Sequence, residues 1–144
     1  MATTASLSPA MRAALIAAVG TDGCYLSCRA ATTQALVRRG LAVHDLDNPS
    51  RWFLTPEGRT AGARLLDRDR SPLQPGDVVV YHGSIDYERG NEYVVLEETK
   101  GRYRIADLED QTYRLRQVRR ESMSRTGRRV DVEEEPSDLT MSLN

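Results

Sequence analysis

Apolar residues recur at helical spacing in the first part of the chain, and turn residues separate the resulting segments. Ser8 is a plausible N-cap and Pro9 suits the first helical position, so a helix is predicted from Ser8 to about Val19. A second helix is predicted over about residues 29–39, and Gly40 is well placed to end it. Both helices have one apolar face, as expected for helices that pack on a common core. The inner stripe of the second helix is predicted to contain Thr32, Ala35 and Leu36, with Thr33 outside it.

Two short strands follow the second helix, and a third helix comes after them. Residues 41–44 and 51–54 are predicted strands, joined by the turn-rich loop 45–50. The third helix opens at Thr55-Pro56-Glu57, where Thr is the cap and Glu meets the positive end of the helix dipole. It is expected to end near Asp69.

The period of the pattern changes from helical to alternating after a short proline-containing linker, Ser71–Gly76. Alternation over about 45 residues predicts strands at Asp77–His82, Asn91–Glu97, Arg102–Asp107 and Thr112–Val118, which suggests a small barrel or meander. After about Glu121 the chain becomes polar and is expected to be a disordered tail. The short linker predicts two compact lobes held at limited separation.

The first part of the chain resembles a known DNA-binding fold. Residues 32–41, TTQALVRRGL, followed by residues 52–59, WFLTPEGR, resemble the recognition helix and wing of winged helix-turn-helix regulators of the MarR and PadR type in bacteria. The resemblance covers about residues 8–69. It departs from the family at Gly20–Cys28, which is too short for a full second helix plus turn. The long flanking helices of MarR-like dimers are also missing, so the dimer and its ligand pocket are not carried over.

The second part weakly resembles a different small fold. Residues 75–83, PGDVVVYHG, resemble the opening strand of SH3-like barrels of the KOW and Tudor types, which bind peptides, modified side chains or nucleic acid. The predicted fold class is therefore α+β: a winged helix-turn-helix domain in residues 1–70, a linker in 71–76, an SH3-like β-barrel in 77–121, and a flexible, basic-then-acidic tail in 122–144. Most of the tyrosines in the β domain are expected to be packing residues.

The resemblance and the physics of groove recognition together nominate residues for DNA contact. Gln34 could read adenine, and Arg29 or Arg38 could read guanine or hold phosphate. Thr33 could bond phosphate, and Arg51 at the wing could reach a minor groove or the backbone. The alternative is that these are solvated side chains on a winged helix that contacts protein.

Charge is unevenly distributed although the net charge is only −1. Residues 114–130 hold seven arginines and one glutamate, and we nominate Arg119 and Arg120 among them as DNA contacts. Residues 131–144 hold five acids and no base. The alternative for the basic stretch is a solvated strand edge and tail, partly neutralised by the acids of 131–138.

The remaining candidate chemistry is sparse. Cys24 and Cys28 have a Cys-x3-Cys spacing with no second pair, so buried thiols are favoured over a metal site, and no cofactor is expected. No phosphate loop, nucleophile elbow or catalytic triad spacing is present, so a non-enzymatic protein is predicted. No apolar run approaches the roughly 20 residues of a membrane span, and the chain is interpreted as cytoplasmic.

These observations favour a DNA-binding protein, specifically a transcriptional regulator that reads duplex DNA with the helix 29–39 and the wing 41–54. The main alternative is a protein-interaction adaptor that uses both domains as binding surfaces, and RNA binding by the β domain is a third possibility. A protein partner of the β domain, the DNA site, the sign of regulation and the oligomeric state are left open by the sequence.

Overall fold

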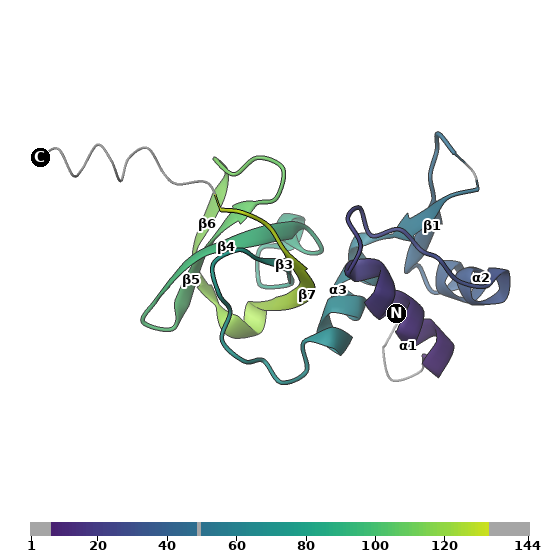
Figure 1. Cartoon of the computed structure of the whole chain (residues 1–144), viewed down its shortest axis with the longest axis horizontal. Coiled ribbons are helices and arrows are strands. Elements are labelled where there is room, and N and C mark those ends of the chain that lie inside the picture. Colours follow the sequence, from purple (N-terminus) through teal and green to yellow (C-terminus); the bar gives the residue numbers. More distant parts are fainter. Residues whose placement is uncertain (1–6, 49, 133–144) are drawn as a thin grey trace, which may run out of the picture.

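The computed structural model describes residues 7–48 and 50–132, which form three α-helices, a two-stranded hairpin and a five-stranded antiparallel sheet (Figure 1). The elements are α1 (Pro9–Val19), α2 (Ala30–Arg38), β1 (Ala42–His44), β2 (Trp52–Leu54), α3 (Pro56–Leu66), β3 (Asp77–Tyr81), β4 (Glu92–Thr99), β5 (Arg102–Asp107), β6 (Arg114–Arg119) and β7 (Met123–Arg129), with short 3-10 turns η2 (Asp86–Glu88) and η3 (Arg120–Ser122). We call residues 7–66 the helical lobe and residues 77–132 the sheet lobe.

The predicted capping residues start α1 and α3. The hydroxyl of Ser8 accepts a hydrogen bond from the amide of Met11, and the Thr55 hydroxyl accepts one from the amide of Gly58. The two helices cross closely at Gly62, where an added Cβ would lie 2.8 Å from the carbonyl oxygen of Leu15. The core of the lobe is built on fully buried apolar side chains, Leu15, Val19, Leu36 and Leu54.

The segment between α1 and α2 contains no helix. Residues 20–29 form turns and one isolated bridge, in which Tyr25 pairs with Phe53 of the hairpin. The expectation that a bracing helix is reduced or absent is therefore confirmed. The hairpin pairs Ala42 with Leu54 and His44 with Trp52.

The sheet has the strand order β6-β5-β4-β3-β7 and is open. Of the two predicted arrangements, an SH3-like β-barrel or a meander, the barrel is wrong because the strands do not close. No ladder joins β6 to β7 within the described residues, although only the short turn η3 separates them in the chain. One face of the sheet carries the main core, which includes Val79, Tyr93 and Ile105. Tyr81 and Tyr103 are also buried, as expected, whereas Tyr87 and Tyr113 are exposed.

The boundary of the β domain at residue 121 was placed too early. Residues 123–129, which the sequence analysis assigned to the flexible tail, form β7 and pair with β3. This strand escaped detection because its buried positions include Ser124 and Thr126, whose hydroxyls bond His82 and the carbonyl of Val78. The expected disorder of residues 133–144 lies outside the described residues.

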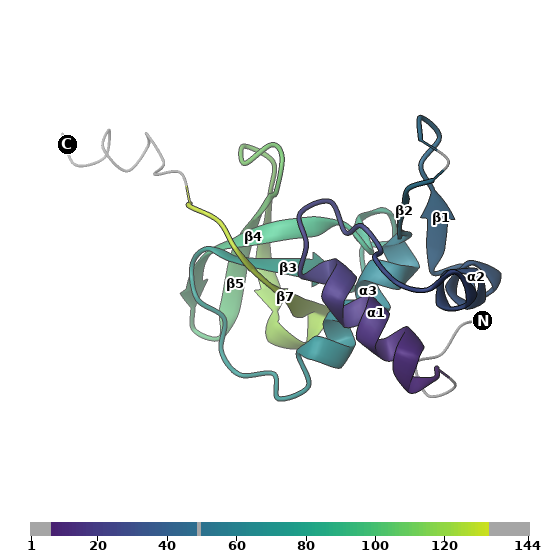
Figure 2. The ribbon, with the colours of Figure 1, turned by 45° about the vertical axis from the view of Figure 1, so that its right-hand side comes forward.

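The two lobes pack directly on each other, with α3 and α1 against β3 and β7 (Figures 1 and 2). Arg128 of β7 donates to the carbonyl oxygen of Val19 at 3.0 Å and forms an ion pair with Glu92. Arg59 of α3 donates to the carbonyl oxygen of Gly90 at 2.6 Å. These contacts span the lobes and confirm the expectation of limited separation.

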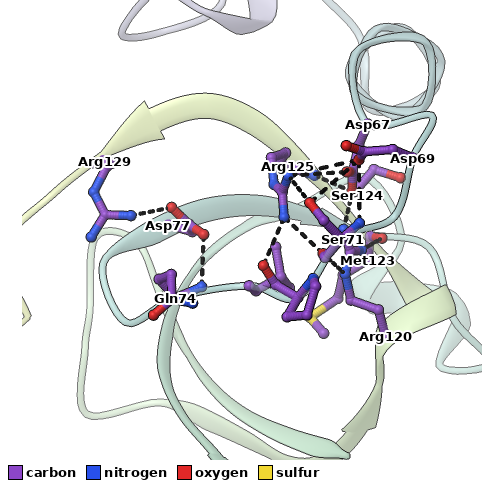
Figure 3. Close-up of polar contacts among 12 residues, drawn as sticks. Asp67, Asp69, Ser71, Gln74, Asp77, Arg120, Met123, Ser124, Arg125 and Arg129 are labelled. Atoms are coloured by element: carbon purple, nitrogen blue, oxygen red, sulfur yellow. Dashed lines mark hydrogen bonds and ion pairs between the residues drawn. The ribbon is translucent and has the colours of Figure 1, made fainter.

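A buried carboxylate fixes the joint between the lobes (Figure 3). The side chain of Asp67, at the end of α3, is fully buried and accepts hydrogen bonds from Nη2 of Arg120 at 2.6 Å and from the amide of Arg125 at 3.0 Å. Both arginines also donate to the carbonyl oxygen of Ser71 at 2.8 Å. The first residue of the linker is thus held by the same side chains that neutralise Asp67.

Candidate nucleic-acid interface

The helix α2 lies at the end of the molecule that is farthest from the sheet, with one face packed and the opposite face in solvent (Figure 2). Leu36 and Thr33 are buried on the inner side. Ala31, Gln34 and Arg38 are exposed and follow one another at spacings of three and four residues, so they share the outer side. Small Ala31 beside two hydrogen-bonding side chains leaves this face open to close approach by a partner.

The N-terminus of α2 is also exposed, and its charge is unusual. Arg29 occupies the N-cap position with an extended backbone, and its side chain makes no capping hydrogen bond. The first turn contains no acidic residue, although a negative charge is the stabilising choice at the positive end of a helix. Arg29 therefore adds positive charge to a helix end that already attracts anions.

The nomination of Thr33 as a phosphate contact is wrong. Thr33 is only 6% exposed, its hydroxyl donates to the carbonyl oxygen of Arg29, and it lies 3.2 Å from the sulfur of Cys28. The predicted inner stripe contained Thr32 in its place. A shift of one position turns a helix by about 100°, which is enough to exchange the two threonines.

Arg51 lies beside the hairpin on an aromatic support. Its guanidinium carbon is 4.6 Å from the centroid of the Tyr25 ring, and that ring packs edge-to-face on Phe53. Such stacking leaves the hydrogen-bonding edges of an arginine available while it fixes the plane of the group. The hairpin tip is different in character, because Asp45 and Asp47 flank the 89% exposed Leu46.

Four of the seven arginines in the basic stretch of residues 114–130 are used in contacts within the molecule. Arg120 is a joint residue, because its guanidinium binds Asp67 and two backbone carbonyl oxygens, so it is removed from the set of candidate DNA contacts. Arg119 is exposed and lies 4.0 Å from a carboxylate oxygen of Glu121. Ion pairs also occupy the three arginines of β7, Arg125, Arg128 and Arg129.

The arginines of the α2 end contrast with these. Within residues 7–48 and 50–132, Arg29, Arg38 and Arg51 have no carboxylate within ion-pairing distance. Gln34 completes a set of four exposed hydrogen-bonding side chains, contributed by one helix and the adjacent hairpin. The structure therefore brings Arg29, Gln34, Arg38 and Arg51 to one end of the helical lobe, and it separates Arg119 from them.

The two cysteines differ in environment. Cys24 is buried, and its thiol donates to Oε2 of Glu92 at 3.2 Å; burial and the negative charge of Glu92 raise its pKa to about 12. Cys28 is exposed, so the expectation of two buried thiols is wrong for this residue. Among the described residues, no three His, Cys, Asp or Glu side chains gather in a way that could hold a metal ion.

None of the helices in the described part of the chain is long and apolar enough to cross a membrane. Comparisons with models of protein families, with curated proteins and with solved structures found no match to the chain. The case for a function therefore depends on the surface chemistry of the described residues.

Proposed function

We propose that this protein binds duplex DNA through the outer face of α2 and the adjacent hairpin, and that it acts as a transcriptional regulator. The proposal interprets the helical lobe as a reduced winged helix-turn-helix domain that lacks one helix. The observation that carries it is the segregation of arginines. The arginines of β7 and η3 form ion pairs within the chain. In contrast, Arg29, Arg38 and Arg51 are exposed at one end of the molecule, where they can contact a ligand.

The exposed side chains suit the two tasks of a groove-binding helix. Gln34 presents an amide that can pair with an adenine edge, and Arg38, one turn later, can pair with guanine. Arg29 and the exposed amides of the first turn would hold a phosphate. Arg51 would contact the backbone beside the helix, with Tyr25 fixing its plane.

The acidic tip of the β1–β2 hairpin, the predicted wing, limits which part of the hairpin can contact DNA. Asp45 and Asp47 would face phosphates unfavourably, so the proposed contact is restricted to Arg51 at the base of the hairpin. The same tip favours the alternative function, a protein-interaction adaptor, because the exposed Leu46 is a suitable anchor for a protein partner.

The experiment begins with selection of binding sequences from a random duplex pool, followed by anisotropy titrations of full-length protein at two salt concentrations. Changing Arg38 to Ala is expected to weaken binding to the selected duplex by about 5- to 150-fold, equivalent to about 1–3 kcal/mol, and to relax preference at one base pair. Changing Arg51 to Ala is expected to weaken binding to all duplexes by the same factor. It should also lower the slope of log affinity against log salt concentration by about 1.

The matched control is Lys100→Ala, which removes one positive charge from an exposed turn of the sheet lobe and is expected to bind like the wild type. Circular dichroism verifies that each variant is folded. Wild-type affinity of both the Arg38 and Arg51 variants for a selected duplex would contradict the proposal. Failure of any duplex to be enriched would favour the adaptor, for which Leu46→Asp is then the informative variant.

A further inference from the structure

A second basic surface lies on the sheet, on the side of β5 and β6 that faces away from the main core. Tyr103 and Ile105 of β5 point into that core, so the alternating residues Arg102 and Arg104 point outward. Ala106 also faces outward, and its cross-strand neighbour is Arg114. On β6, Leu115 and Val118 pack in the main core, so Arg116 and Arg119 face the other side. We call the five residues of this surface the arginine face; its members are Arg102, Arg104, Arg114, Arg116 and Arg119.

The strands β5 and β6 supply few acidic side chains to balance the positive charge of the arginine face. Arg102 and Arg119 are directly opposite each other in the ladder, a like-charge pairing that destabilises a sheet. Ion pairs join Arg104 to Glu97 and, at 4.0 Å, Arg119 to Glu121. Within the described ranges, 7–48 and 50–132, neither Arg102 nor Arg116 lies within ion-pairing distance of a carboxylate.

The end of the described chain leads to this face. After β7 the chain turns, with the amide of Val130 donating to the carbonyl oxygen of Gly76 at 2.9 Å, and then crosses the sheet away from the helices (Figure 2). Val132 packs on a small apolar cluster of β4 and β5 that contains Val94, Leu96 and Ala106. The last described residue therefore packs on the cluster that contains Ala106, the cross-strand neighbour of Arg114.

We propose that the acidic segment 133–138 of this chain docks on the arginine face as its resident occupant. The segment reads Glu-Glu-Glu-Pro-Ser-Asp, so four acids in six residues follow directly on Val132. The acids of this segment complement the positive charge of the arginine face. Val132, which packs on the β4–β5 cluster, brings the start of the segment to that face.

The lengths involved fit the proposal. Neighbouring strands lie about 4.8 Å apart, and an extended residue advances the chain by about 3.4 Å. The three glutamates after Val132 thus span about 10 Å, which is about two strand spacings and enough to reach from the β4–β5 cluster to Arg114 on β6. Leaving the arginine face open would expose the guanidinium groups of Arg102 and Arg116, which attract polyanions without selectivity.

The docked segment would prevent such binding and restrict anion contacts to the α2 end. This consequence builds on the proposed function, but the docking itself does not depend on it. The experiment below therefore uses heparin and a spin label in place of DNA.

The direct test places a nitroxide on residue 137 of the full-length protein through Ser137→Cys in a Cys28→Ser background; buried Cys24 stays unlabelled. Broadening of the amide signals of β5 and β6 is measured by NMR in this protein. The same measurement is made after the triple change Arg102→Gln, Arg114→Gln and Arg116→Gln, which is expected to reduce the broadening, as is added salt. Unchanged broadening in the triple variant would overturn the proposal.

The control for that measurement replaces three exposed arginines elsewhere, Arg68, Arg70 and Arg89, by Gln, with the same change in net charge. It is expected to leave the broadening as in the labelled wild-type chain. Equal loss of broadening in the control would show that only overall charge matters and would also overturn the proposal.

A second readout measures binding of fluorescent heparin. Changing residues 133–135 from Glu to Gln in the full-length chain is expected to raise heparin affinity by about tenfold, since three exposed ion pairs are lost. The matched control, Glu57→Gln with Asp86→Asn and Glu109→Gln, changes net charge equally from other exposed sites and is expected to have a clearly smaller effect. Equal gains in the two triple variants would contradict a docked segment, whatever the outcome of DNA binding.

Discussion

Replacing Asp67 by Ala removes the one carboxylate that both Arg120 and Arg125 contact at the joint between the lobes. Its side chain is fully buried, and the side chains of Arg120 and Arg125 are only 14% and 25% exposed. Removing one partner of a buried ion pair costs about 3–5 kcal/mol, because it leaves uncompensated charge behind. The carbonyl oxygen of Ser71 still accepts from both arginines, which places the expected loss near the lower end, at about 3 kcal/mol.

The assay is unfolding in urea, monitored by two spectroscopic probes. Trp52, the only tryptophan, reports on the hairpin of the helical lobe, and far-ultraviolet circular dichroism reports on the whole fold. Because the lobes share the joint, the two transitions should coincide in the wild type. The matched control is Asp69→Ala, whose carboxylate is 75% exposed and 3.9 Å from Arg125, with an expected cost below about 1 kcal/mol. Equal costs for the two variants would refute the assignment of Asp67 as the residue that fixes the joint.

Other predictions concern packing and titration. Gly62→Ala should destabilise the fold by about 1–3 kcal/mol in thermal unfolding, because the new Cβ would lie 2.8 Å from the Leu15 carbonyl oxygen; an unchanged midpoint would mean that the helices can separate. Burial and Arg64 lower the pKa of His82 to about 4, so the unfolded chain binds a proton that the folded chain does not between pH 6.5 and 4. The free energy of unfolding should therefore fall as pH is lowered through that window, by at most about 1.4 kcal/mol per pH unit from this group, and His82→Gln should flatten the dependence. Mass spectrometry after brief alkylation of the native protein should find Cys28 modified and Cys24 intact; rapid modification of Cys24 would contradict its burial and raised pKa.

Local signals in the sequence predicted α1 and α3 well because each of these two helices starts with a capping residue that acts within one turn. Ser8 and Thr55 bond amides three residues away, so their role is visible without knowledge of the fold. The same locality explains the success with the hairpin and with the first strands of the sheet, β3 and β4, whose apolar runs of four residues are buried on both faces.

Features that depend on distant partners could not be predicted in the same way. Arg120 is a joint residue only because Asp67, 53 residues earlier in the chain, is buried against it. The strand β7 buries Ser124 and Thr126, whose polar character hides the alternation that identifies a strand. The error at Thr33 has a different origin: with Ala, Thr and Leu at close spacing, two helical phases separated by one residue look equally apolar.

The central claim, that the outer face of α2 contacts duplex DNA, is tested most directly by NMR titration of the full-length protein with a selected duplex. The account predicts that the largest changes in amide signals occur at residues 29–39 and at Arg51. Signals of β5 and β6, including Arg119, should change little. Changes confined to the sheet lobe, or none at saturating duplex, would contradict the account.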